Sequence, residues 1–517
     1  MTMRSSANRI SPSTASWQFL LCVLFALGMS CTNSRAAVLT ASGYRSPVPS
    51  DAPDAGQQAQ IASQYGMFCH FGINTFLNEE WSDGSASPTN YCPSTVDADQ
   101  WVRTAYLAGM RYIICITKHH DGFCMWPSAY TSYSVKNSGN TNDVVRLVSN
   151  ACDKYGLKFA IYYSLWDRHE PSYQTNFNPD YISYMTNQLT ELLSNYGPVC
   201  ELWLDGSWDK PNTAWQLPVL YDVVKRLQPD CQMGVNWPIG WPTNVDSGAA
   251  PDQQRDGFPI RYFPSDFRLD DPRMPVFPDP KLFSNPNVAT NSPLHYPYYL
   301  PFEATITLSP SNNWFYKIGD DGAKSVATLE PMWDQCTAQS NRLVLNAPPD
   351  RNGVLLPSNS NALVRLAYQL GLVPGRPFPI NLAEGCAATA SSVWENDISH
   401  YGPAFAVDGD PNSRWASGPV GATNGWLAVD FAKPTKFNQV IIREYANRVQ
   451  SFQLQAWDGT TWKTIKKGTT IGASLRLDFP AVTTSRLRLN ILSSSDAPSI
   501  YMIKVHYVNT TESPQVR

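Results

Sequence analysis

The sequence predicts an α/β protein, a (β/α)8-like barrel of the TIM type followed by an antiparallel β-sandwich. Two observations carry this prediction. Between residues 67 and 370, short apolar runs alternate with stretches of helical periodicity, which is typical of parallel strands joined by crossover helices. After residue 380, short alternating segments are separated only by turn residues, as in an antiparallel sandwich. A chain of 517 residues is long enough for both domains.

The first half of the predicted barrel shows the strand–helix alternation most clearly. The expected strands are 67–75, 112–118, 158–165, 200–205 and 232–236, and the expected helices between them are 96–109, 142–155 with Asn142 as its cap, 181–196 and 215–227. Polar and ionisable residues recur where the strands end, which favours a closed barrel over an open sheet. No glycine-rich phosphate loop follows any strand, which weighs against a Rossmann-type domain.

The second half of the barrel is less regular. Residues 237–300 are rich in Pro, Asp and Phe and lack helical periodicity, so we expect a long loop region, which is usually functional or disordered. Regular patterning then resumes. We expect strands at 298–308 and 341–346 and helices at 323–340 and 358–370.

A shift in composition marks the end of the barrel. The expected organisation is a signal peptide 1–36, a catalytic barrel 37–372, a Pro/Gly linker 373–380, a sandwich 381–508 and a tail 509–517. The expected sandwich strands are 426–431, 437–445, 451–457, 475–479, 486–492 and 501–507.

The N-terminus has the form of an export signal, with basic Arg4 and Arg9 before an apolar run that is too short to span a bilayer. Cleavage near Ala36 would leave nine cysteines, an odd number at wide spacing, so we expect mostly buried thiols. Cys31 is an alternative lipidation site in a poor sequence context. We expect a secreted or periplasmic protein with no membrane span. A net charge of −4 gives no support for a nucleic-acid partner.

The segment CELWLDGSW, residues 200–208, is the most informative in the chain. Leu202, Trp203 and Leu204 are apolar without alternation, as in a strand covered on both faces. Asp205 then stands at the carboxyl end, where the chemistry of parallel barrels is found. The alternative is that Asp205-Gly206 forms a hairpin turn.

The other early strands end in a similar way. The residues at these ends are His70, Glu79, Glu80, Trp81, His119, His120, Tyr162, Tyr163, Trp166, Asp167, Arg168, Trp203 and Asp205. Barrel geometry would bring them to one rim. Carboxylates surrounded by His and Trp suit glycoside hydrolysis, in which one carboxylate attacks the anomeric carbon and another acid protonates the leaving oxygen. A zinc site formed by the three histidines is an alternative, although adjacent His119 and His120 point to opposite faces while the strand continues.

Taken together, HFGINTF with EEW, TKHHDGFCMW, YYSLWDRHE and ELWLDG resemble the family 29 glycoside hydrolases, the retaining α-L-fucosidases, and in particular the branch that acts on α-1,3 and α-1,4-linked fucose. The resemblance covers about residues 55–370. It implies a (β/α)8-like barrel joined to a β-rich domain, no metal in the barrel and no cofactor.

The resemblance also implies roles for individual residues. Asp205 matches the family nucleophile, which forms a covalent fucosyl-enzyme. The matching substrate-binding residues are His70, Glu80, Trp81, His119, His120, Tyr163 and Trp203. The acid/base departs from the family pattern, because no glutamate occurs between Glu201 and Glu303. Asp266 in RYFPSDFR falls where that glutamate is expected, and Glu303 in YYLPFEATI is the other candidate. The alternative for Asp266 is a turn acid paired with Arg261 or Arg268.

The C-terminal segments AFAVDGDPNSRWAS and GWLAVDF resemble a discoidin-like (coagulation factor type C) sandwich, a fold also used by family 32 carbohydrate-binding modules. This resemblance implies a possible structural calcium at Asp408, Asp410 and Ser413. A tight turn built by Asp-Gly-Asp-Pro is the alternative.

Two classes of function follow. The first is an exported exo-glycosidase that hydrolyses terminal α-linked L-fucose from glycans or oligosaccharides, with a related α-L-galactoside hydrolase as the variant within the class. The second is a fucose-binding protein that has lost its acid/base. The absence of the loop glutamate favours the second class, and the intact nucleophile motif favours the first.

Overall fold

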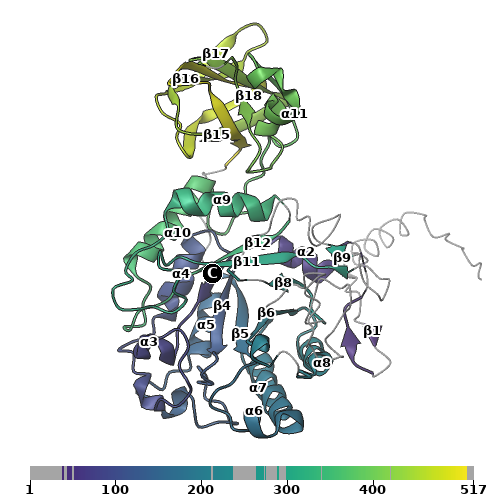
Figure 1. The fold of residues 1–517 in the computed structure, drawn as a ribbon, viewed down its shortest axis with the longest axis vertical. Coiled ribbons are helices and arrows are strands. Elements are labelled where there is room, and N and C mark those ends of the chain that lie inside the picture. Colours follow the sequence, from purple (N-terminus) through teal and green to yellow (C-terminus); the bar gives the residue numbers. More distant parts are fainter. Residues whose placement is uncertain are drawn as a thin grey trace, which may run out of the picture. The chain divides into compact units, whose positions relative to one another are not determined.

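The N-terminal part of the structure is a nearly closed parallel barrel. The computed structural model describes residues 43–508 except 49, 51, 211–212, 237–263, 270, 273, 275–287, 290–297, 339 and 420, together with the backbone of 38–39. Eight parallel strands pair in the order β7-β6-β5-β4-β3-β12-β11-β8. A parallel bridge between Asn236 and Leu269 joins the two edges of this sheet. The predicted barrel is therefore confirmed (Figure 1).

The strands follow one another around the barrel in sequence order. They are β3 (Tyr65–Cys69), β4 (Tyr112–Lys118), β5 (Lys158–Ser164), β6 (Val199–Asp205), β7 (Gln232–Val235), β8 (Arg268–Leu269), β11 (Phe302–Thr307) and β12 (Arg342–Asn346). The longer helices are α4 (Ala98–Leu107), α5 (Val144–Tyr155), α7 (Ile182–Asn195), α8 (Leu217–Leu227), α9 (Val326–Thr337) and α10 (Pro357–Leu370). Shorter elements are β1 (Val38–Leu39), β2 (Arg45–Ser46), α2 (Ala55–Ile61), α3 (Ile73–Leu77), α6 (Ser172–Thr175), β9 (Val288–Ala289) and β10 (Tyr298–Tyr299).

Helix α5 shows how the sequence sets these elements. The carboxylate of Asp143 accepts a hydrogen bond from the backbone N–H of Arg146 at 2.9 Å, so the helix begins after Asp143. Asn142 is therefore not its cap. The helix ends at Tyr155 and is followed by Gly156, whose φ of +68° is readily adopted only by glycine. Val145, Val148 and Cys152 form one buried face, as the helical period requires.

Two predicted strands have different bounds in the structure. The first ends at Cys69, because the chain turns into α3 and Asn74 hydrogen-bonds Asp121 and the backbone of Ser82 instead of continuing a ladder. The expected strand 298–308 is split into β10 and β11. Pro301 lies at the break, where it has no N–H to offer a ladder.

Alternation along each strand separates two apolar cores. Phe68, Ile114, Tyr162 and Trp203 belong to the buried cluster that fills the barrel interior. The neighbours Tyr163 and Leu204 belong instead to the cluster between the strands and the helices. A side chain at the rim can therefore reach the interior only from every second position of its strand.

The C-terminal part is the predicted sandwich. Antiparallel strands pair in the order β14-β19-β15-β18-β16-β17, with β13 added beside β15. The elements are β13 (Ala387–Ala390), α11 (Ile398–Tyr401), β14 (Trp415–Ala416), β15 (Gly425–Glu444), β16 (Val449–Trp457), β17 (Trp462–Gly468), β18 (Leu475–Ser494) and β19 (Ser499–His506). The expected pairs 426–431 with 437–445 and 475–479 with 486–492 are each one long strand, bent at register shifts.

Several sequence predictions fall outside the described residues. These are the signal peptide, the lipidation alternative and the C-terminal tail. Within the described residues all nine cysteines are free thiols, and most of them are buried. Among the same residues, no helix has the length and apolarity that a membrane crossing requires.

Candidate active site

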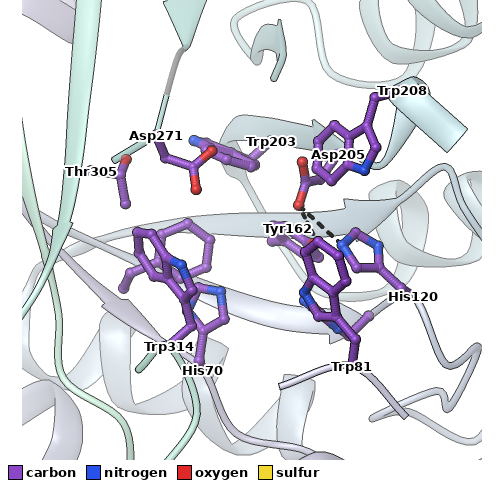
Figure 2. A pocket seen from close by; sticks show the side chains of 12 residues that line it. His70, Trp81, His120, Tyr162, Trp203, Asp205, Trp208, Asp271, Thr305 and Trp314 are labelled. Atoms are coloured by element: carbon purple, nitrogen blue, oxygen red, sulfur yellow. Dashed lines mark hydrogen bonds and ion pairs between the residues drawn. The ribbon is translucent and has the colours of Figure 1, made fainter. Parts of the chain in front are cut away.

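A pocket opens at the carboxyl ends of the barrel strands. Its lining residues come from at least six segments of the chain (Figure 2). They are Phe68, His70, Trp81, His119, His120, Tyr162, Trp203, Asp205, Trp208, Asp271, Thr305 and Trp314. The expectation that the early strand ends meet at one rim is therefore confirmed for His70, Trp81, His119, His120, Trp203 and Asp205.

Asp205 is the last residue of β6 and projects into this pocket. The chain does not make a hairpin after it, because β7 runs parallel to β6. Gly206 has a φ of +84°, and a Cβ at this position would lie 2.7 Å from the Cβ of Trp166 and 3.1 Å from Nδ1 of His120. Only glycine fits both the backbone conformation and the space, so Gly206 lets Asp205 approach the imidazole closely.

The Asp205 carboxylate has an oriented set of partners. The hydroxyl of Tyr162 donates to Oδ2 at 2.6 Å, and Nδ2 of Asn236 donates to Oδ1 at 3.0 Å. Burial raises the pKa of Asp205 from 3.8 to about 6, and these two hydrogen bonds counteract part of the rise because they favour the charged form. The group is therefore ionised at neutral pH and held in one orientation.

His120 lies beside Asp205, with its Nε2 at 3.7 Å from Oδ2 (Figure 2). Its Nδ1 is 2.7 Å from the hydroxyl of Ser164, whose single proton goes to the carbonyl of Trp166 at 2.6 Å. Ser164 must then accept from Nδ1–H, which leaves Nε2 as an acceptor. Burial lowers the pKa of His120 to about 3, so the ring is neutral.

The other two imidazoles are held in opposite tautomers. Nδ1 of His70 contacts Oδ1 of Asn346 at 2.8 Å, and the amide of Asn346 is oriented by donating to the carbonyl of Trp314. His70 therefore carries its proton on Nδ1. Nδ1 of His119 instead faces the amide nitrogen of Asn74 at 3.4 Å and accepts from it, which places the His119 proton on Nε2. Burial lowers the pKa of both rings.

Aromatic side chains form much of the remaining wall. Trp81 is 50% exposed and packs edge-on against His120, with 5.5 Å between ring centroids. Trp203 stacks on Tyr162, with 5.5 Å between ring centroids.

Glu80, which was expected to bind substrate, does not line the pocket. Its carboxylate accepts from the backbone N–H of Trp314 at 3.0 Å and so holds the loop that carries this indole.

Tyr163 is also placed away from the pocket. It lies on the outer face of β5, where its hydroxyl accepts from Nζ of Lys118 at 2.9 Å and donates to Gln188 at 2.8 Å. The neighbouring Tyr162 is the tyrosine that reaches the interior. The substrate contact expected for Tyr163 is corrected on this ground, since adjacent strand residues point to opposite faces.

The two sequence candidates for the acid/base do not line the pocket. The Asp266 carboxylate accepts from the hydroxyl of Tyr221 at 2.7 Å and pairs with Nζ of Lys225 at 2.8 Å. The Glu303 carboxylate pairs with Nη2 of Arg342 at 2.5 Å. Glu303 also accepts from the hydroxyl of Tyr112 at 2.8 Å and from the indole of Trp203 at 3.0 Å, and burial raises its pKa.

Some side chains that line the pocket were not singled out from the sequence. Asp271 and Thr305 line it from the second half of the barrel, and Trp208 and Trp314 from loops. Asp271 is bonded by Nδ2 of Asn236, the same nitrogen that contacts Asp205. Asp271 follows β8 by two residues, and this position after a strand is the feature of the sequence from which it could have been predicted. The two-residue strand is too short to show a period.

Metal ligation was an alternative for the histidines and for the sandwich loop. The described residues contain no group of three or more His, Cys, Asp or Glu placed to hold an ion. In the sandwich, the hydroxyl of Ser413 lies 2.9 Å from both carboxylate oxygens of Asp408, and the backbone N–H of Asp410 donates to Asp408 at 2.9 Å. This loop therefore forms a hydrogen-bonded turn from its own groups.

Comparisons with known proteins agree on the two domains. Residues 35–257 match the family model "Alpha-L-fucosidase", and residues 387–504 match "F5/8 type C domain". The chain is 28% identical over 452 residues to "Alpha-L-fucosidase 1" of Arabidopsis thaliana, which covers 85% of this chain and 83% of the relative. A solved glycoside hydrolase 29 family member from an unknown rumen bacterium is 28% identical with a TM-score of 0.51, covering 91% of this chain and 79% of that one. The α-L-fucosidase isoenzyme 1 of Paenibacillus thiaminolyticus, at 20% identity and a TM-score of 0.52 over 87% of this chain and 99% of that one, shares the fold.

Proposed function

From the premise that this chain belongs to the α-L-fucosidase family of glycoside hydrolases and carries an F5/8 type C domain, we propose that it is a retaining α-L-fucosidase with Asp205 as its nucleophile. The observation that carries this proposal is the position of Asp205. Its carboxylate is buried at the end of a barrel strand, ionised at neutral pH, and surrounded by three neutral imidazoles and an aromatic wall.

The geometry supports attack by Asp205 on the anomeric carbon of fucose. The bond from a carboxylate oxygen to C1 forms as the bond from C1 to the aglycone oxygen breaks, which gives a β-linked fucosyl ester. Tyr162 and Asn236 hold one oxygen each, so the carboxylate does not have to be reoriented before attack. Water then cleaves the ester and returns the α-configured sugar.

The imidazoles and indoles support recognition of the sugar. With their tautomers fixed as described, His70 and His120 offer acceptors to sugar hydroxyls and His119 offers a donor. A fucose residue linked through C1 has three free hydroxyl groups and a methyl group at C5. The methyl group and the apolar ring face suit the indoles that line the pocket, because burial of such groups is favourable.

An α-L-galactoside differs from an α-L-fucoside by one hydroxyl at C6. On this proposal C6 packs against the indoles of the pocket, which offer a hydroxyl few partners, so fucosides should be preferred. The fucose-binding alternative requires that turnover be absent. Natural substrates are terminal α-linked fucose residues of glycans or oligosaccharides on this proposal, and export by residues 1–36 would place the protein in the periplasm or outside the cell.

Hydrolysis of 4-nitrophenyl α-L-fucoside by the wild type, beside Asp205→Asn, tests this proposal. We expect wild-type turnover and a loss of about 10⁴-fold in kcat for Asp205→Asn. Asp230→Asn, the same change at an exposed surface position, serves as the matched control and should keep full activity. Proton NMR should show α-L-fucose as the first product. Normal activity of Asp205→Asn, or β-L-fucose as the first product, would contradict the proposal.

A further inference from the structure

Two of the side chains that line the pocket carry a carboxyl group, Asp205 and Asp271. They come from the ends of different strands, since Asp205 closes β6 and Asp271 follows β8 by two residues. Figure 2 shows both carboxyl groups directed into the pocket, on the side opposite His70 and Trp81. A sugar bound in this pocket would therefore lie within reach of two acids.

Asn236 fixes how far apart these two acids are. Its Nδ2 lies 3.0 Å from Oδ1 of Asp205 and also bonds Oδ1 of Asp271. Two oxygens that share one nitrogen partner are at most about 6 Å apart, which is two hydrogen-bond lengths. Retaining glycosidases hold their two carboxyl groups about 5–5.5 Å apart, whereas inverting enzymes need about 6.5–9.5 Å for an intervening water. The shared amide is compatible with the retaining separation.

The other candidate acids are already engaged. The Asp266 carboxylate faces Lys225 and Tyr221, and Glu303 faces Arg342 and Tyr112. Both are almost fully buried, and neither lines the pocket. A group that is paired with a buried cation outside the pocket is poorly placed to deliver a proton to a leaving oxygen inside it.

We infer that Asp271 is the acid/base of this enzyme, an inference that rests on the proposed fucosidase function. In the first step the Asp271 carboxyl proton passes to the glycosidic oxygen as the C1–O bond breaks and Asp205 bonds to C1. In the second step the Asp271 carboxylate takes a proton from water, whose oxygen attacks C1 and releases Asp205. Each step moves one proton and exchanges one bond at C1, and the enzyme returns to its starting state.

The test compares two substrates in Asp271→Ala. One is an aryl α-L-fucoside with a strongly acidic phenol as leaving group, and the other is an α-fucosyl disaccharide. A good leaving group needs no proton, so kcat/KM for the aryl substrate should stay within about tenfold of the wild type, while that for the disaccharide should fall at least about 100-fold. The fucosyl-enzyme should then accumulate, and a burst of phenol should precede slow turnover.

The anomeric configuration of the product formed with azide shows which carboxyl group a variant lacks. In Asp271→Ala, azide should attack C1 of the β-linked ester, break its bond to Asp205 and give α-L-fucosyl azide. In Asp205→Ala, azide should displace the phenol directly and give β-L-fucosyl azide. Asp266→Asn and Glu303→Gln are the matched controls. Each should change both substrates by the same factor and give no azide product.

The outcomes distinguish failure of the Asp271 assignment from failure of the fucosidase proposal. Equal losses on both substrates without an azide product in Asp271→Ala would overturn the role of Asp271, while turnover by the wild type and inactivity of Asp205→Ala would leave the fucosidase proposal standing. The substrate split appearing in Asp266→Asn or Glu303→Gln would also overturn it. A wild type inactive on both substrates would contradict the fucosidase proposal itself. Asp271→Asn, which keeps the shape of the side chain, repeats the test if Asp271→Ala has a lowered melting temperature.

Discussion

The two halves of the barrel contribute to the pocket in different ways. In the first half, His70, His119, His120 and Asp205 stand at the ends of β3, β4 and β6, and each of these residues belongs to a contiguous motif. In the second half, Asp271 and Trp314 line the same pocket from irregular chain, and Thr305 lines it from β11, with no motif around any of them. The difference shows that sequence motifs predict pocket residues at the ends of regular strands and do not predict those in irregular segments of the chain.

The second half also contains charges with a structural role. Arg342 on β12 pairs with Glu201 at 2.7 Å and with Glu303 at 2.5 Å, and all three side chains are almost fully buried. We predict that Arg342→Met lowers the free energy of unfolding of the barrel by about 3–5 kcal/mol, because the buried Glu201 loses its cation and the buried Glu303, whose pKa burial raises to about 8, loses a hydrogen-bond donor. Urea unfolding followed by tryptophan fluorescence measures this.

Glu303→Gln provides the matched comparison. It leaves Arg342 paired with Glu201, and the amide oxygen can still accept from one of the two donors, Tyr112 or Trp203, which bond different oxygens of Glu303. The loss should be about 1 kcal/mol. If the two variants were equally stable, Arg342 would not be the structural centre of this cluster, and the contrast between catalytic and structural charges in the two halves would fail.

Neighbouring tyrosines on β5 sharpen the comparison within the first half. Tyr162→Phe removes the hydroxyl that donates to Asp205, so kcat should fall by roughly 10–100-fold. Tyr163→Phe removes a hydroxyl that bonds Lys118 and Gln188 outside the pocket. It should lower stability by about 1–3 kcal/mol and keep kcat within about twofold. A larger loss of kcat in Tyr163→Phe would reverse the assignment of the two faces.

These cases indicate how much the sequence could predict. The barrel, the sandwich and most of the pocket in the first half followed from periodicity and from motifs at strand ends. Tyr163 was misplaced because a family motif does not show which of two adjacent tyrosines faces inward, and only the register of β5 decides this. Asp266 was named as a candidate and Asp271, which also lies near β8, was not, because strand ends in irregular chain are not marked by any period.

The pH dependence of activity tests the first half as a unit. With its pKa raised to about 6, Asp205 is protonated at lower pH and cannot attack, so kcat/KM should fall about tenfold per pH unit below 6. His70 and His120 have pKa values near 3 and stay neutral over this range, so they should not contribute. Initial rates from pH 4 to 8 measure the profile.

Stability should change in the opposite direction over the same range. A carboxyl whose pKa is higher in the folded than in the unfolded state contributes stability below pH 4, and this contribution is lost as the pH rises through 6. Asp205→Asn should remove that part of the pH dependence. Tyr162→Phe should move the acid limb of kcat/KM to higher pH, because the hydroxyl of Tyr162 lowers the pKa of Asp205. A limb that did not move would argue against titration of Asp205 as its origin.

The sandwich contains a loop for which the sequence allowed two interpretations, a structural calcium site and a hydrogen-bonded turn. Asp408 is bonded by the hydroxyl of Ser413 and by the backbone N–H of Asp410, so the turn is closed by protein groups. We predict that Asp408→Ala costs about 1 kcal/mol of stability and that added calcium or a chelator shifts the wild-type melting temperature by less than about 2 °C. A larger calcium shift that disappears in Asp408→Ala would establish the metal site instead. In that case calcium would replace the hydrogen-bonded turn as the cause of the Asp-Gly-Asp-Pro sequence, because a cation needs the same carboxylate oxygens that Ser413 and Asp410 now contact.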